Sequence, residues 1–166
     1  FEPAETVTAV QSILLEAAKE RGPGAMLFGL GLNHYRFPNR ELPTKDDLDA
    51  AAPENPAFVG GVTGHYAVAN TRCLDQHSLP GDMPGLDPSG LLRDRANTLV
   101  GRQVRSQFAQ EVGLETLYRA AARRAVSVGL TTVHALEGVE GRDDPHVRAL
   151  LYARDKLPVG VVVWYQ

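Results

Sequence analysis

Two polar side chains that could serve a ligand site end an apolar, β-branched stretch of the sequence. Residues 129–138 are GLTTVHALEG, so His134 and Glu137 close a run with the composition of a strand. Ligands of parallel α/β folds gather beyond the carboxyl ends of the strands, and such a strand would deliver both residues there. The alternative is that His134 caps the strand through the backbone and that Glu137 is a solvated loop residue. The pattern leaves both interpretations open.

A second histidine has a similar setting. His65 follows the strand-like stretch AFVGGVTG, in which Gly64 lets the chain turn sharply, and Asn70 comes five residues later. Both could face a polar substrate, with the Asn70 amide as a hydrogen-bonding partner. The alternative is a histidine that packs or caps within a loop. His34, in NHYRFPNR, could add to the rim of such a site or lie in a solvated loop.

The motifs of other kinds of site are missing from the sequence. It contains no HxH, no HExxH, no cysteine pair and no GxSxG. The glycines of GLGLN lie within a predicted strand and do not have the spacing of a phosphate-binding loop. Cys73, the single cysteine, stands in an apolar setting and is expected to be a small core residue.

Hydrophobic periodicity predicts the elements that would position these residues. Apolar residues recur at helical spacing in residues 6–22, AMLFGLGLN predicts a buried strand, and Thr44 is placed to cap a short helix that ends before Pro53. PAFVGGVTG predicts a second strand, whereas residues 65–76 form a short amphipathic segment of uncertain type. Residues 78–90, with three prolines and three glycines, predict a loop, and helices are expected from residue 91 and from residue 113.

The C-terminal part predicts the fold class. After the helix that begins at residue 113 come the strand with His134, a helix starting at Pro145, and the apolar run VGVVVWYQ. Helices that alternate with strands apolar on both faces are typical of a parallel sheet covered by helices. The sequence therefore predicts an α/β protein.

Composition excludes several classes of partner. Seventeen basic and twenty acidic residues give a formal charge of -3, so the sequence lacks the excess of basic residues with which proteins bind nucleic acids. No apolar run approaches the roughly 20 residues of a membrane helix, so no membrane partner is expected. One cysteine fits a reducing compartment, which favours a cytoplasmic location. The chain begins FEPAET and stops within an apolar run, so it is expected to be a piece of a longer polypeptide.

Several stretches together resemble a known family in order and spacing. These are ELPTKDDLDAAAPENPAFV, TGHYAVANTRCL, LDPSGLLRD, GLTTVHALEG and LPVGVVVWYQ. They resemble the metal-dependent amidohydrolases of the group that includes N-substituted formamide deformylase. The resemblance implies a distorted (β/α)8 barrel and hydrolysis of carbon–nitrogen bonds, other than peptide bonds, by a metal-activated water.

The resemblance also implies how the chain divides. Residues 1–22 would hold the first barrel helix and residues 113–166 the second and third barrel strands, with residues 23–112 as an inserted α+β subdomain. The family's metal ligands are an HxH, a lysine, two histidines and an aspartate, and none of these motifs is in this sequence. A divalent metal, zinc, is thus expected in the full-length protein and none in this segment, which alone would be inactive.

The resemblance assigns roles to the candidate residues. His134 would be a substrate-side residue more than a metal ligand, and His65, with Asn70, would reach the same site from the inserted subdomain. Glu137 would be a substrate-side residue that could also approach a metal from the second strand. Thr63 and Ala135 stand where the family usually has aspartate, so the family's substrate preference is not carried over to this sequence.

Expected partners are a small-molecule amide substrate and further copies of the chain in a homo-oligomer. The competing interpretation is a stand-alone α/β ligand-binding or interaction module that uses residues 78–90 to hold a partner.

Overall fold

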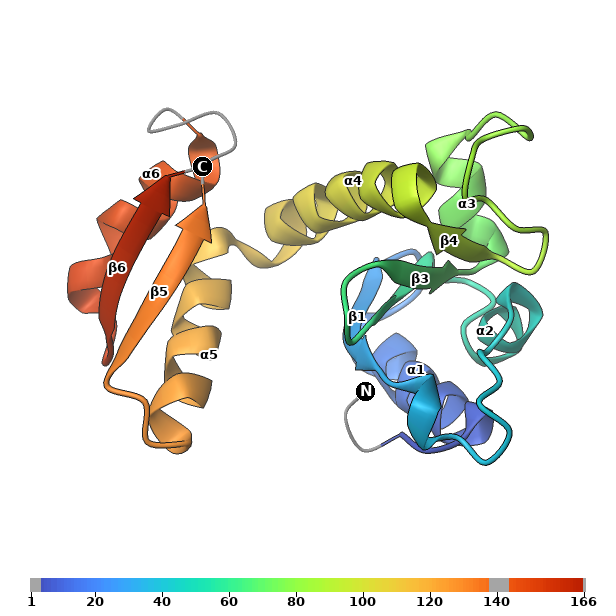
Figure 1. The fold of residues 1–166 in the computed structure, drawn as a ribbon, viewed down its shortest axis with the longest axis horizontal. Helices are drawn as coiled ribbons and strands as arrows, with labels where there is room; N and C mark the ends of the chain where they lie inside the picture. The colour runs from blue at the N-terminus through green and yellow to red at the C-terminus, as the bar shows by residue number, and fades with distance from the viewer. Residues whose placement is uncertain (1–3, 138–143, 166) are drawn as a thin grey trace. The chain divides into compact units, whose positions relative to one another are not determined.

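The computed structural model describes residues 4–137 and 144–165. Their contacts divide the chain into a first unit, Phe1–Phe108, and a second unit, Ala109–Gln166, and each is described by itself. The first unit contains, in order, α1 (Val7–Arg21), β1 (Leu27–Leu32), the 3-10 helix η1 (His34–Arg36), α2 (Lys45–Ala51), β2 (Ala57–Gly61), β3 (Tyr66–Ala69), α3 (Thr71–His77), β4 (Leu91–Arg93) and α4 (Asp94–Val112), which ends just past the boundary (Figure 1).

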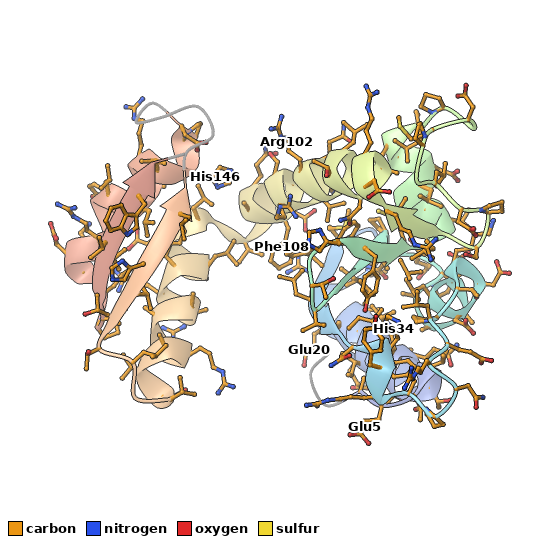
Figure 2. The ribbon with its side chains drawn as sticks, in the orientation of Figure 1. Glu5, Glu20, His34, Arg102, Phe108 and His146 are labelled. Carbon is orange, nitrogen blue, oxygen red and sulfur yellow. The ribbon has the colours of Figure 1, made fainter. Side chains whose placement is uncertain are left out.

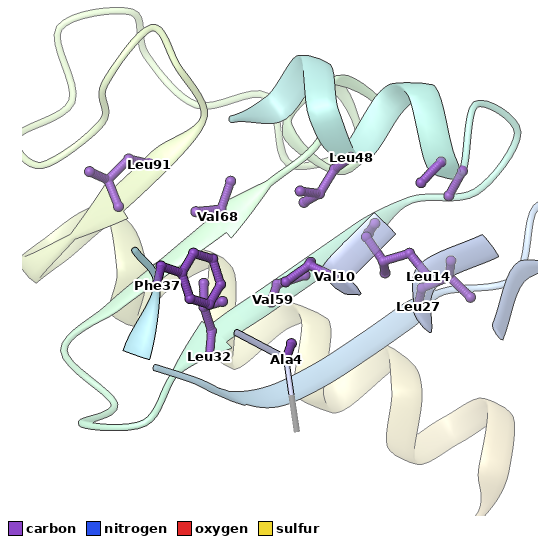
Figure 3. Close-up of a cluster of buried hydrophobic side chains, with 13 residues drawn as sticks. Ala4, Val10, Leu14, Leu27, Leu32, Phe37, Leu48, Val59, Val68 and Leu91 are labelled. Atoms are coloured by element: carbon purple, nitrogen blue, oxygen red, sulfur yellow. The ribbon is translucent and has the colours of Figure 1, made fainter. Parts of the chain in front are cut away.

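A four-stranded mixed sheet with the order β1-β2-β3-β4 forms the centre of the first unit. Strands β1 and β2 are parallel, and β2/β3 and β3/β4 are antiparallel. The alternation of side chains along the strands supplies two cores. Val59 and Val68 pack with α1 and α2 on one face, as Figure 3 shows, whereas Phe58 and Leu92 pack with α3 and α4 on the other. Burial on both faces explains the near-continuous apolar character of these strands.

Most predicted elements of this unit are confirmed. Helix α1 and strands β1 and β2 lie where the periodicity places them, and Thr44 caps α2 in a capping box with Asp47. The segment of uncertain type divides into β3 and α3. The helix expected from residue 91 was placed too early, because residues 91–93 pair with β3 as β4 and the helix begins at Asp94, whose φ of 46° marks the abrupt change of direction.

Helix α1 packs within the first unit. Its residues Val10 and Leu14 are buried against Leu27, Leu48 and Val59. The sequence-based division groups residues 1–22 with residues 113–166 as barrel segments, whereas in this structure α1 covers the sheet of the segment expected to be the inserted subdomain. The division itself stays a prediction about a longer protein.

The second unit contains α5 (Leu114–Ser127), β5 (Thr132–Glu137), α6 (Pro145–Ala153), the 3-10 helix η3 (Arg154–Lys156) and β6 (Gly160–Tyr165). Strands β5 and β6 are parallel, as the sequence predicts, and the mixed α/β class is confirmed. One face of this strand pair lies toward α5 and α6 around a cavity of about 220 Å³ lined by apolar side chains, among them Val133 and Val161. The opposite face exposes Leu136 and Trp164.

The Asn70 amide joins four parts of the first unit. Its Oδ1 accepts hydrogen bonds from the backbone N–H groups of Ala57 and Cys73, at 2.9 and 3.0 Å. Its Nδ2 donates to the carbonyl oxygens of Asn55 and Ala52, at 2.9 and 3.4 Å. The side chain is fully buried, so these bonds satisfy backbone groups with no access to water.

Replacing Asn70 by alanine is expected to lower the free energy of unfolding by about 3 kcal/mol, because buried N–H and C=O groups lose their partner and α3 loses its N-cap. Urea unfolding followed by circular dichroism measures this loss. Asn39→Ala, in an exposed loop, is the matched control and should change stability by less than about 0.5 kcal/mol. Equal effects of the two substitutions would contradict the structural role of Asn70.

Cys73 is a core residue, as predicted, and burial raises the pKa of its thiol to about 12. The folded protein is expected to resist thiol-specific reagents at pH 8 and to react at one thiol per chain after unfolding in urea, since the thiolate is the reactive form. The unfolded chain releases this proton first, so stability should also fall as the pH rises above about 9. Rapid labelling of the folded protein would place Cys73 outside the core.

Candidate functional site

His65 lies at an open cavity of about 370 Å³ in the first unit. Besides His65, the cavity is lined by polar side chains from three separate segments of the chain: His34, Thr63, Tyr66, Arg93 and Asp94. Gly64, with a φ of 75°, forms the turn between β2 and β3 that presents His65, and its carbonyl oxygen accepts a hydrogen bond from the Asn97 amide of α4. The structure thus places His65 at a cavity with several polar groups in its wall, and its predicted substrate-side role stays a prediction.

Tyr66 lies in the wall of this cavity because a glycine makes room for its ring. A Cβ atom at Gly61 would meet the Tyr66 ring at 2.3 Å, so no other residue fits beside it without a rearrangement. The Tyr66 hydroxyl group donates a hydrogen bond of 2.7 Å to the Leu32 carbonyl oxygen. Burial raises the pKa of this phenol, so the proton needed for that bond is held at neutral pH.

The same hydroxyl group selects the tautomer of a neutral His34 imidazole, and His34 is labelled in Figure 2. His34 Nδ1 lies 2.9 Å from the Tyr66 oxygen. A phenol has one proton, and Tyr66 gives it to Leu32, so His34 must donate from Nδ1. A neutral imidazole that carries its proton on Nδ1 keeps Nε2 as an acceptor. His34 therefore contributes an imidazole of defined tautomer at the cavity wall.

The charges at the cavity are mixed. The guanidinium of Arg93 and the carboxylate of Asp94 are consecutive along the chain, at the junction of β4 and α4. With two imidazoles and the Thr63 hydroxyl group, the cavity offers both hydrogen-bond donors and acceptors. Leu42 and the Tyr35 ring add apolar surface, so the lining suits a small molecule with both polar and apolar parts.

Asn70 does not line this cavity in the structure. Both acceptor positions of its oxygen and both N–H groups of its amide are already used by backbone groups of the fold. The substrate-side role predicted for Asn70 is a prediction that this geometry does not favour.

His134 lies in β5 on the exposed face of the second unit's strand pair. Its Nδ1 accepts a hydrogen bond of 2.8 Å from the indole Nε1–H of Trp164 in β6, and the two rings are stacked at 15°. Glu137 is the last residue of β5, where its backbone pairs with Tyr165, and its side chain lies outside the described residues. The prediction that His134 ends the strand is wrong, because β5 continues through Ala135 and Leu136 to Glu137 by pairing with β6. His134 therefore lies within the strand and Glu137 at its end, and the roles of both residues stay predictions.

His65 belongs to the first unit and His134 to the second. Their joint membership of one site is therefore a prediction that the described geometry leaves open.

A metal centre needs several donor side chains that converge on one point. Within residues 4–137 and 144–165, no three His, Cys, Asp or Glu side chains come together in a way that could hold an ion. His134 Nδ1 is occupied by Trp164, and Cys73 is buried in an apolar cluster. These residues do not by themselves fit a metal ion. The same ranges contain no helix that is both long and apolar enough to cross a membrane.

Sequence reasoning missed three residues of these sites: Tyr66, Arg93 and Trp164. Tyr66 immediately follows His65, but its importance depends on Gly61 and Leu32, which lie apart from it in the sequence. Trp164 is hidden in the apolar run VGVVVWYQ. Its residue type could have indicated it, because it is the only tryptophan in the sequence and its N–H group needs a hydrogen-bond acceptor.

Tyr66→Phe removes the acceptor of His34 and the side-chain donor to Leu32, and it is expected to lower the free energy of unfolding by about 1–2 kcal/mol. Tyr35→Phe is the matched control, because the Tyr35 side chain is 65% exposed, and its effect should stay below about 0.5 kcal/mol. Thermal and urea unfolding measure both. An unchanged free energy of unfolding in Tyr66→Phe would mean that the hydroxyl group does not stabilise the fold.

Comparisons with known proteins agree with this fold. The chain is 33% identical over 129 residues to protein LONG AFTER FAR-RED 3 of Arabidopsis thaliana, a match that spans 71% of this chain and 22% of that protein. An uncharacterized metal-dependent hydrolase from Pyrococcus horikoshii OT3 has a similar structure, with a TM-score of 0.66 and 21% identity over 98% of this chain and 31% of its own. An uncharacterized metal-dependent hydrolase from Pyrococcus furiosus is also similar, with a TM-score of 0.61 and 22% identity over 93% of this chain and 32% of its own.

The chain spans about a fifth of the curated relative and about a third of the two solved structures. The structural likenesses, at these identities, show the fold alone. The model of the amidohydrolase family matches residues 2–165, nearly the whole sequence. The chain therefore belongs to the amidohydrolase family.

Proposed function

We propose that this chain is part of a metal-dependent hydrolase that cleaves carbon–nitrogen bonds other than peptide bonds. The observation that carries the proposal is the match of residues 2–165 to the amidohydrolase family. The two proteins of similar structure, both described as uncharacterized metal-dependent hydrolases, support it. Within the family we place the protein with N-substituted formamide deformylase, because of the stretches TGHYAVANTRCL and GLTTVHALEG.

In this proposal the strand pair β5/β6 is a portion of a (β/α)8 barrel. Two parallel strands covered by helices on one face match the repeating unit of such a barrel, and catalytic residues of barrels lie at the carboxyl ends of their strands. His134 is the third of the six residues of β5, and Glu137 lies at the carboxyl end of this strand. The face that carries His134, opposite α5 and α6, would then line the barrel interior.

The metal would be held by residues beyond this chain. A divalent metal, zinc in our proposal, activates water and polarises the scissile carbonyl group when it is bound. The described residues would bind and orient a small amide or formamide: the imidazoles of His65 and His134 offer hydrogen bonds to its polar groups. The 166-residue chain alone would neither retain a stoichiometric metal nor hydrolyse amides. A homo-oligomeric assembly in the cytoplasm belongs to the same proposal.

The test is a pair of substitutions, His65→Ala and His134→Ala, in the longer polypeptide encoded by the reading frame around this sequence. Each should lower kcat/KM for N-acyl and formamide substrates at least about tenfold, equivalent to about 1.4 kcal/mol of transition-state stabilisation. Melting temperature and bound metal should not change, since both side chains are exposed. Steady-state kinetics, calorimetry and metal analysis provide the three measurements.

His146→Ala is the matched control, because His146 lies at the start of α6 and not at the end of a strand. Its kcat/KM should equal that of the unsubstituted protein. An unsubstituted protein that hydrolyses no carbon–nitrogen substrate would refute the proposed function. Full activity of His65→Ala or His134→Ala would remove only that histidine from the site.

A further inference from the structure

The hydrogen bond between Trp164 and His134 fixes the tautomer of the histidine. An indole N–H group can only donate, so His134 Nδ1, at 2.8 Å, must be the acceptor. A neutral imidazole with an unprotonated Nδ1 carries its proton on Nε2. His134 is thus the opposite tautomer to His34, whose Nδ1 donates to Tyr66.

Strand geometry directs this pair away from the helices. Val133 and Ala135 line the cavity between the strands and α5/α6, so their neighbour His134 lies on the opposite face. In β6, Val161 lines the same cavity, so Trp164, three residues further along the strand, lies on the opposite face with His134. Leu136 and Trp164, aligned in the strand register, are 65% and 54% exposed on that face.

The local composition indicates what this face could bind. The Nε2–H group of His134 is a hydrogen-bond donor surrounded by exposed apolar surface from Leu136, Val162 and Trp164. A donor in such a setting suits an acceptor oxygen carried by an apolar acyl or aryl group. It does not suit a metal ion, which needs the lone pair of an unprotonated imidazole nitrogen.

We propose that Trp164 is a positioning residue that holds His134 as the Nε2–H tautomer, so that His134 donates a hydrogen bond to the acyl oxygen of the substrate. This inference rests on the proposed function, and it adds a role for Trp164 and a defined chemical task for His134. In this role His134 is neither a metal ligand nor a general base. Trp164 acts through His134 and is expected to influence the substrate through that ring.

The tautomer can be measured on the 166-residue chain without any substrate. Nitrogen-15 NMR of the imidazole rings distinguishes Nδ1–H from Nε2–H, with the His134 signals assigned by their loss in His134→Ala. Wild-type His134 should be the Nε2–H tautomer, and Trp164→Phe should turn it into a mixture. His34 should stay Nδ1–H in both proteins, which makes it an internal reference. An Nδ1–H tautomer in the wild type, or no change in Trp164→Phe, overturns the inference.

Kinetics in the longer polypeptide test the consequence. Trp164→Phe should lower kcat/KM about 5- to 10-fold, and the double variant with His134→Ala should be no worse than His134→Ala alone, because Trp164 acts only through that ring. Tyr152→Phe, an aromatic substitution at a residue of α6 that is 70% exposed, is the matched control and should leave both tautomer and activity unchanged.

Additive losses in the double variant would overturn the positioning role. A wild-type protein with no hydrolytic activity would refute the proposed function, whereas the NMR result would still decide whether Trp164 sets the tautomer of His134.

Discussion

The first unit depends on one constraint, which is that the backbone groups at the junction of α2, β2, β3 and α3 are buried and need hydrogen-bond partners. Asn70 supplies them with a single amide that accepts twice and donates twice. A leucine or valine of similar size would leave these groups unsatisfied in an apolar interior. The ends of two strands and two helices therefore meet at this side chain. Those strands in turn hold the β2/β3 turn that presents His65 at its cavity.

The tautomers of His34 and His134 are each set by a partner that can act only as an acceptor or only as a donor of the hydrogen bond. The Tyr66 hydroxyl group has given its proton to a carbonyl oxygen and can only accept from His34, and the Trp164 indole can only donate to His134. The same residue type therefore presents Nε2 as an acceptor in one unit and as a donor in the other. Residue type alone could not assign these roles, since they follow from the neighbour.

Much of the fold follows from the sequence because its signals are local. The periodicity of residues 7–21, the capping box at Thr44 and the apolar runs of β5 and β6 each need only nearby residues. Residues 91–93 were misassigned because LLR has no local strand signal and becomes β4 only by pairing with β3. The site was less predictable for the same reason. His65 follows a recognisable strand and His134 lies within one, but the bond from Tyr66 to Leu32 joins residues 34 positions apart.

Strand register decides whether the second unit can present a site at all. In the parallel pair, His134 is aligned with Val162 and Leu136 with Trp164. Trp164 therefore lies two residues beyond the partner of His134, which puts the indole on the same face as the imidazole. A register slip of one residue would turn Trp164 toward α5 and α6 and away from His134. That register is held by the apolar face, where Val133, Ala135 and Val161 line the cavity against the helices. The packing that buries one side of β5 and β6 therefore also sets the hydrogen bond, and with it the proton, on the other side.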